Sequence, residues 1–269
     1  MTDAIFDPEA HQGRYDFWMR TPAPRKVYAI LFTPRSGSSW LTSVLTKTRM
    51  MGTPGEWFNP TLMTSSSRSK GARNLEQFIE TISRHEAHGG IFGFEITYYQ
   101  MMAVFGDEAS FIENFRNSTF FWLIRKDIVA QAVSLDKMVQ TKVSHASNHD
   151  EGEIIASDSA YDYNGSRIKE WISHIRNAEK ATENMIKTFS LRPIRLAYEP
   201  MMASGATEVA RIFRNELGIT DDIPPDLETD HRKIGTEKNN VFAERFRTDY
   251  PQFIKTLENE RADMLAEFP

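Results

Sequence analysis

The chain has 269 residues, a formal net charge of −5 at pH 7 and no cysteine. This length can bury a sizeable core as one large domain or two small ones. The absence of cysteine excludes disulfides, thiolate metal sites and cysteine nucleophiles. Because the net charge is negative, we expect no broad polyanion-binding surface and no nucleic-acid partner, and any anion site must be local.

The N-terminal segment is polar and acidic, and residues 1–20 lack the apolar stretch of a signal peptide. No apolar run in the chain reaches the length that crosses a bilayer, so we expect no transmembrane segment and a cytoplasmic protein. Residues 1–25 have the character of an arm that ends at a Pro-rich stretch, and residues 26–269 are expected to form a single domain.

Apolar runs typical of buried strands alternate with segments of helical spacing along the rest of the chain. The expected strands cover residues 26–33, 91–97, 119–124 and 194–198. The expected helices cover residues 39–48, 74–88, 107–116, 128–145, 161–189 and 207–217, with two more helices after residue 236 that are broken near Pro251. Polar residues 59–72 are expected to form an exposed loop or lid, and residues 146–160 a mobile segment.

This alternation predicts a three-layer α/β fold with a central, mostly parallel sheet flanked by helices. Right-handed crossovers place the carboxyl ends of such strands at one edge, where ligands bind. The turns that follow the first three strands carry Arg35, Thr97 and Arg125, and we expect them to converge at that edge.

The strongest motif lies where the first strand ends. The apolar run of residues 27–32 is followed by Arg35-Ser36-Gly37-Ser38-Ser39 and then by a helical pattern that begins near Trp40. The N–H groups of such a turn and the positive end of the helix dipole can hold a phosphate or sulfate. Arginine, hydroxyl groups and a glycine without a Cβ suit the same ligand, and the serines are expected to cap the helix.

A junction of this kind also occurs in α/β proteins that bind no ligand. The turn lacks the lysine of the G-x-x-x-x-G-K-[ST] loop of nucleotide triphosphatases. The chain has no G-x-G-x-x-G either, which argues against a dinucleotide site of the usual kind.

Two further segments carry chemical groups towards this edge. Residues 52–60 hold two glycines and two prolines around Glu56, and this turn can direct the carboxylate back to the anion site; alternatively, Glu56 is a surface carboxylate and the neighbouring aromatics are core anchors. Arg125 leaves a buried strand, and Ser134 follows about two and a half helical turns later, so both could hold one phosphate. Alternatively, Arg125 forms a salt bridge at the helix start and Ser134 is incidental.

A basic patch at residues 231–235, which includes Arg232, is a weaker candidate for ligand contact, because basic loops are usually solvated.

Taken together, these motifs resemble the bacterial trehalose sulfotransferase family and its lipopolysaccharide-sulfotransferase-like relatives, over residues 27–248. The turn at Arg35 resembles the family's R-S-G-S-[ST] loop for the 5′-phosphosulfate, and residues 52–58 resemble its G-x-P-x-E-[FW]-F motif. Arg125 and residues 129–134 resemble its R-x-D-x-V-x-Q-A-V-S segment for the 3′-phosphate.

The resemblance implies a P-loop-like sulfotransferase fold and transfer of a sulfuryl group from 3′-phosphoadenosine 5′-phosphosulfate (PAPS) to a hydroxyl, without a metal. It implies that Glu56 is the general base and that Arg35 takes part in catalysis. The donor-binding residues that we expect are Arg35, Ser36, Gly37, Ser38, Ser39, Trp40, Arg125, Ser134 and Arg232. The acceptor-binding residues that we expect are Pro34, Thr53, Pro54, Gly55, Trp57, Phe58 and Asn59.

The chain departs from the trehalose enzyme at the acceptor side. Pro34 and Thr53 replace a glutamine and a glutamate that contact sugar in that enzyme, and Glu95 replaces a lysine. The expected acceptor is therefore a hydroxylated small molecule, such as a glycan or a glycolipid head group, other than trehalose. The resemblance also implies a homodimer. A P-loop-like kinase and an inactive nucleotide-binding scaffold on the same fold are the alternatives.

Overall fold

The computed structural model describes residues 5–143, 151–229 and 236–269. The basic patch at 231–235, and Arg232 with it, lies outside the described residues. Outside them too lie residues 144–145, at the end of the helix expected at 128–145, and residues 146–150 of the segment expected to be mobile.

A four-stranded parallel sheet forms the centre of the described chain, in the order β2-β1-β3-β4. The strands are β1 (Lys26–Phe32), β2 (Ile91–Thr97), β3 (Thr119–Ile124) and β4 (Ile194–Ala197). These are the four strands that the sequence predicts, with the ends of the first and the last one residue shorter. In the register, Phe32 at the end of β1 lies opposite Thr97 of β2 and Leu123 of β3, so the strands' carboxyl ends meet at one edge.

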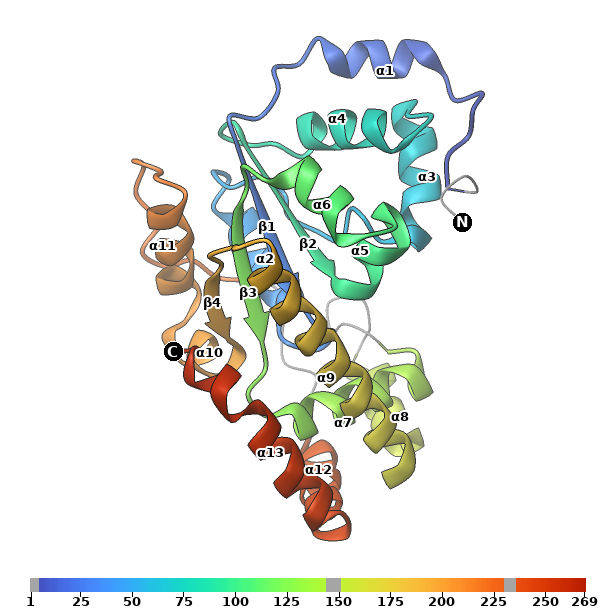
Figure 1. Ribbon diagram of the computed structural model, residues 1–269, viewed down its shortest axis with the longest axis vertical. Coiled ribbons are helices and arrows are strands. Elements are labelled where there is room, and N and C mark those ends of the chain that lie inside the picture. The colour runs from blue at the N-terminus through green and yellow to red at the C-terminus, as the bar shows by residue number, and fades with distance from the viewer. Residues whose placement is uncertain (1–4, 144–150, 230–235) are drawn as a thin grey trace.

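Helices cover both faces of the sheet, which gives the three-layer α/β architecture that the sequence predicts (Figure 1). On one face lie α2 (Ser38–Lys47), α10 (Tyr198–Ser204) and α11 (Ala206–Glu216), which pack on the side chains of alternate strand residues such as Ile30. The other face is covered by helices that pack on the intervening strand residues, such as Leu31: α3 (Pro60–Lys70), α4 (Leu75–His85), α5 (Tyr98–Phe105) and α6 (Glu108–Phe115).

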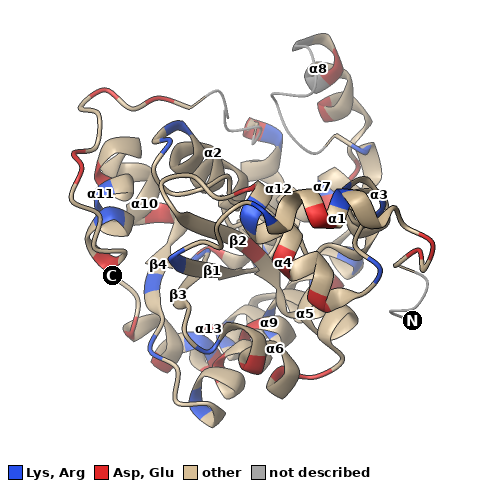
Figure 2. Cartoon of the chain, turned by 90° about the horizontal axis from the view of Figure 1, so that it is seen from above, with Lys and Arg blue, Asp and Glu red and all other residues tan. Residues whose placement is uncertain are grey.

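Beyond the carboxyl edge of the sheet, a second group of helices extends the molecule downwards in Figure 1. It contains α7 (Ile128–Thr141), α8 (Glu151–Ala160), the long α9 (Gly165–Thr188), α12 (Glu237–Asp249) and α13 (Pro251–Ala266). Their apolar side chains form a separate core between α7, α9, α12 and α13. Basic and acidic residues are interspersed over the helices (Figure 2), as the modest net charge suggests.

The prediction of an exposed loop at residues 59–72 is wrong, because this segment forms α3. The Asn59 side chain caps the helix by accepting a hydrogen bond from the N–H of Thr61, and Pro60 occupies the first turn. Gly71 ends the helix in the left-handed conformation at φ 76°. The run of serines concealed an inward face, on which Met63 and Ser67 are fully buried.

The sequence analysis does not predict four further helices, namely α8 in a polar segment and the short α1 (Gln12–Met19), α5 and α10. Residues 151–160 form α8, while α1, α5 and α10 lie in segments to which the sequence assigned no helix. The eight-residue α5 follows β2 with no linker, because Thr97 and Gln100 form a reciprocal capping box at its start. Because α5 begins at the residue after β2, no turn residues separate the two elements in the sequence, and the helix was not predicted.

The N-terminal segment expected to be an arm is docked on the domain. The Tyr15 hydroxyl donates to Glu80 of α4 at 2.5 Å, and the backbone carbonyl of Ala10 accepts a hydrogen bond from Arg73. Ile5 is 8% exposed and belongs to the core that faces α3 to α6. No helix within the described ranges is long and apolar enough to cross a membrane.

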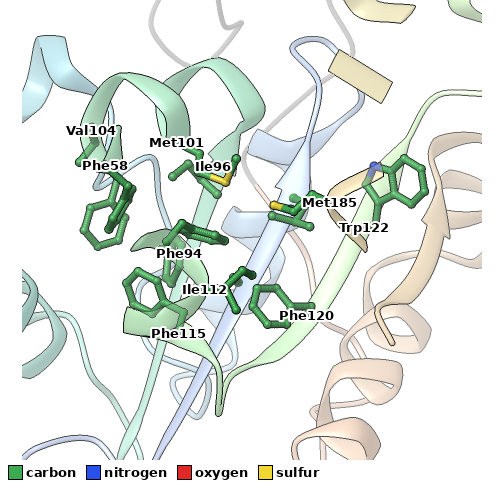
Figure 3. Packing of buried hydrophobic residues seen from close by; sticks show 14 of the residues in the cluster. Phe58, Phe94, Ile96, Met101, Val104, Ile112, Phe115, Phe120, Trp122 and Met185 are labelled. Atoms are coloured by element: carbon green, nitrogen blue, oxygen red, sulfur yellow. The ribbon is translucent and has the colours of Figure 1, made fainter. Parts of the chain in front are cut away.

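Phe58 lies near Phe94 and Phe115 in the aromatic core (Figure 3). It is fully buried, and its ring packs against those of Phe94, Phe105 and Phe115 at centroid distances of 4.9, 5.4 and 5.6 Å. The expectation that Phe58 contacts an acceptor is therefore wrong, because its side chain is enclosed by other core residues.

We predict that Phe58→Ala lowers the free energy of unfolding by about 3–5 kcal/mol, because it removes a fully buried ring and leaves a cavity. Urea denaturation followed by circular dichroism measures this change. The control is Phe17→Ala, whose ring is 58% exposed and whose loss should change stability by less than about 0.5 kcal/mol. Equal stability of the two variants would contradict the placement of Phe58.

Candidate active site

The parallel register brings two arginines together at the carboxyl edge of the sheet. Arg35 follows β1 and Arg125 follows β3, and these two strands are direct neighbours. The two guanidinium groups are close enough that the charge of Arg125 depresses the pKa of Arg35, after burial, which is the larger cause of the lowered pKa. The sheet therefore places two basic groups in one partly buried region, which favours an anionic ligand.

The turn between β1 and α2 adopts an unusual backbone. Arg35 has φ 67° and Gly37 has φ 89°, so both residues are in the left-handed region. Gly37 is the N-cap of α2, and no side chain caps this helix. The expectation that the serines cap it is wrong, because the N-cap position falls on the glycine. The N–H groups of the first helical turn, which includes Ser38 and Ser39, therefore remain available for an anion.

A tyrosine closes the side of this turn. A Cβ at Gly37 would lie 2.6 Å from the Tyr198 ring, so the glycine allows the ring to approach the backbone. The guanidinium of Arg125 lies over the same ring, 4.7 Å from its centroid. This cation–π contact orients Arg125 beside the turn that carries Arg35.

The Arg35 side chain extends to α7, where its Nε donates to the Ser134 hydroxyl at 3.1 Å. The structure thus brings together Arg35, Arg125 and Ser134, three of the residues that the sequence assigned to donor binding. Arg35 itself contacts the serine that the resemblance associates with the second phosphate, so the two motifs form one continuous site.

Two hydrogen-bond donors at the site are buried and have no hydrogen-bond partner among the described residues, namely Ser36 Oγ and Arg125 Nε, the second of which lies 4.0 Å from Glu199 Oε1. Native proteins seldom leave such atoms unsatisfied. A bound phosphate or sulfate accepts hydrogen bonds from groups of both kinds, so the donor set fits an anionic nucleotide such as PAPS.

Buried polar residues hold the arginine-bearing turns in place. Gln131 of α7 is fully buried, and its Nε2 donates to the Thr33 hydroxyl at 2.9 Å and to the carbonyl of Pro34 at 2.7 Å. Gln131 therefore ties α7 directly to the turn that precedes Arg35. Pro34, expected to contact the acceptor, takes part in this structural bond through its carbonyl.

The turn after β3 is fixed from two sides. Arg261 of α13 is 2% exposed and donates to the carbonyls of Arg125 and Lys126 at 2.9 and 2.6 Å, while it forms an ion pair with buried Glu179. On the other side, the Glu199 carboxylate accepts the N–H groups of Lys126 and Asp127, each at 3.0 Å. The backbone from Arg125 to Asp127 is consequently held by two charged side chains, Arg261 and Glu199, and Glu179 in turn holds Arg261.

Glu56 lies in the turn before α3 and is half-buried. Its Oε2 accepts hydrogen bonds from Asn59 Nδ2 at 3.0 Å and from Gln100 Nε2 at 2.5 Å. No described residue donates a hydrogen bond to Oε1. Two amides thus orient the carboxylate and leave one oxygen able to accept a proton.

Glu95 connects Glu56 with the anion turn. It lies on β2, is 4% exposed, and its backbone N–H donates to the carbonyl of Gly55 at 3.0 Å. Burial, followed by the nearby Glu56 charge, raises the pKa of Glu95 from its ordinary value of 4.5 to about 8, against the effect of a hydrogen bond from the Ser38 hydroxyl. Glu95 therefore lies close to both Glu56 and Ser38.

The other expected acceptor residues are distributed differently. The Thr53 hydroxyl lies 3.3 Å from Nδ1 of His88, and the Thr53 N–H donates to the backbone carbonyl of Glu86. Thr53 therefore lies towards the amino end of β2, away from the arginines. Trp57 packs on the aromatic core and donates to the carbonyl of Thr53 at 3.0 Å. Pro54 is buried, and the carbonyl of Gly55 accepts a hydrogen bond from the N–H of Glu95 on β2. Of this group, Asn59 is the residue whose side chain contacts Glu56.

Trp40 is half-buried and packs on the core beneath α2, which makes it an anchor of the helix behind the anion turn. The carbonyl of Ser39 accepts a hydrogen bond from Thr42 within the same helix. Arg232 has no described position.

Sequence reasoning missed several residues that shape the site: Tyr198, Glu199, Gln131, Gln100 and Arg261. Gln131 and Gln100 had a local signal, since each follows a strand end by a few residues in the first or second turn of a helix. Tyr198 directly follows β4, the same position relative to the sheet edge that drew attention to Arg125. Arg261 had no such signal, because α13 reaches the site from the end of the chain.

Among the described residues, no group of three or more histidine or acidic side chains could hold a metal ion.

A family model described as Stf0 sulphotransferase matches residues 97–249, which is more than half of the chain. The match begins after Arg35, Glu56 and Glu95, and it includes Arg125, Ser134 and Tyr198. Among curated proteins, no match to the chain was found.

We predict that the Glu95 carboxyl makes stability fall with rising pH. Because the folded state holds the Glu95 proton up to about pH 8 and the unfolded chain releases it near 4.5, this contribution is complete below pH 4.5 and is lost as pH rises through 8. Glu95→Gln mimics the neutral form, so its Tm should exceed that of the wild type by a margin that grows between pH 5 and 8. Differential scanning calorimetry at several pH values measures this margin, and a margin independent of pH would contradict the prediction.

Proposed function

We propose that this chain, which belongs to the Stf0 sulphotransferase family and is a sulfotransferase, uses PAPS as donor and a hydroxylated carbohydrate or glycolipid head group as acceptor. The observation that carries the proposal is the cluster of Arg35, Arg125 and Ser134 beside a helix start whose glycine N-cap has no side-chain cap. Such a cluster suits a ligand with two phosphate-type groups.

We assign the donor's 5′ end to the turn at Ser36–Ser39 and its 3′-phosphate to Arg125 and Ser134, with Arg35 between them. When bound, PAPS supplies a sulfuryl group activated by its bond to a phosphate, and adenosine 3′,5′-bisphosphate remains. The turn N–H groups, the Ser36 hydroxyl and Arg35 stabilise negative charge in the transition state. These donors are fixed in advance by Gln131 and by the backbone of the turn.

Glu56 is the proposed general base. Its Oε1 accepts the proton of the acceptor hydroxyl as the new bond to sulfur forms, a contribution of about 10²–10⁴-fold for general base catalysis. Asn59 and Gln100 hold the opposite oxygen and so point Oε1 at the acceptor. Since Phe58 and Thr53 are directed elsewhere, we place the acceptor next to Asn59 and Gln100.

The donor assignment is tested by ligand-dependent melting. Adenosine 3′,5′-bisphosphate at a free concentration of 100 times its Kd should stabilise the protein by about 2.7 kcal/mol and raise Tm, whereas ATP with Mg²⁺ should have little effect. Arg125→Met should weaken bisphosphate binding by about 10- to 100-fold, the loss of one charge-assisted interaction. The matched control is Arg116→Met, an exposed arginine on the far end of α6. Stabilisation by ATP with Mg²⁺ instead would indicate a kinase.

The role of Glu56 is tested separately from binding. We expect Glu56→Gln to keep bisphosphate affinity within about threefold and to lose at least 100-fold in kcat, because glutamine preserves the shape and cannot accept the proton. A transfer assay with labelled PAPS and a panel of glycans measures turnover and identifies the acceptor. Glu113→Gln, an exposed carboxylate on α6, serves as the control. Unchanged kcat in Glu56→Gln would remove this residue from its role.

A further inference from the structure

Glu95 is a buried carboxyl that the proposed reaction does not use. Alternation along β2 places Phe94 and Ile96 on the face covered by α5, and therefore Glu95 on the face covered by α2. There it lies beneath the start of α2, where Ser38 belongs to the anion turn. The Glu95 N–H donates to the carbonyl of Gly55, the residue that precedes Glu56, so this bond holds Glu95 beside the turn that carries Glu56.

The groups around Glu95 do not neutralise a negative charge. Glu56 faces it from the turn before α3, Ser38 from α2 and fully buried Tyr28 from β1. Within the described residues, Glu95 forms no ion pair with a lysine, arginine or histidine, and its Oε2 has no hydrogen-bond partner. Glu95 also raises the pKa of Tyr28, whose shift is caused mainly by burial.

Other buried carboxylates of this protein are treated differently. Asp136 is fully buried and accepts hydrogen bonds from Arg167 and Trp171, and Glu179 is fully buried and binds Arg261. Their charges are compensated where they lie. Glu95 has no comparable cation, so the neutral, protonated form is the one that its surroundings favour.

We propose that Glu95 is a positioning residue of the sulfuryl-transfer site, which remains protonated at neutral pH and so keeps a second negative charge away from the anion turn and from Glu56. This inference rests on the proposed function, since it concerns the site that binds the donor. The neutral carboxyl acts through Ser38 and Glu56 and touches no reacting atom.

The consequence is a donor affinity that depends on pH. When the Glu95 carboxyl releases its proton to solvent, its charge lies beneath the turn that holds the donor's phosphate and beside the Glu56 carboxylate. Both effects oppose binding of an anion. Donor binding should therefore require the protonated form, and binding in alkaline solution should return a proton to Glu95.

The test is isothermal titration calorimetry with adenosine 3′,5′-bisphosphate between pH 6.5 and 9.5. For the wild type we expect Kd to rise about tenfold between pH 7 and 9, because a group with a pKa of about 8 must be reprotonated on binding. Glu95→Gln should keep the wild-type Kd of pH 7 across this range, and Glu113→Gln should follow the wild type. Titrations of the wild type at pH 8 in buffers of different ionisation enthalpy should show uptake of about half a proton, a readout that needs no variant.

The possible results separate the two proposals. A pH dependence that is the same in the wild type and in Glu95→Gln, or no proton uptake at pH 8, overturns this inference and leaves the proposed function standing. Failure of the bisphosphate to bind the wild type even at pH 6.5 overturns the proposed function, and this inference falls with it. A flat profile in Glu95→Gln with a steep one in the wild type supports both.

Discussion

The parallel pairing of β1 with β3 is the constraint on which the site depends. It aligns the ends of two strands whose paired residues, such as Phe32 and Leu123, are about 90 positions apart in the chain, and so places Arg35 and Arg125 next to each other. Burial and mutual repulsion both work against two guanidinium groups in this position, as the lowered pKa of Arg35 indicates. An anion between them would relieve the repulsion, so the sheet register itself favours a ligand with negative charge.

Holding two like charges together requires a rigid frame, and the frame is built from buried polar groups. Gln131 fixes the turn before Arg35, while Arg261 and Glu199 fix the backbone at Arg125 from opposite sides. These bonds come from α7, α13 and α10, so three separate parts of the chain converge on two turns. Preorganised donors of this kind need little rearrangement when charge develops during a reaction.

Much of the fold could be predicted from the sequence, because the signals were local. The four apolar strands and their alternation with helices gave the parallel three-layer architecture, and strand ends indicated Arg35 and Arg125. The prediction failed at α3, where a serine-rich segment is helical because Asn59 and Gly71 define its ends. It also failed for Phe58, because the path of the turn along β2 directs this side chain into the core. The sequence analysis identified Glu95 as a replacement for a lysine of the trehalose enzyme. Its protonation state, however, depends on residues of β1, α2 and the turn at Glu56, which come together only in the tertiary structure.

The most direct test of the account is a crystal structure of the complex with adenosine 3′,5′-bisphosphate. We expect one phosphate to accept hydrogen bonds from the N–H groups at Gly37–Ser39 and from Ser36, and the other from Arg125 and Ser134, with the Arg35 guanidinium between the two. A nucleotide bound elsewhere, with Arg35 and Arg125 in contact with none of its phosphate oxygens, would contradict the account.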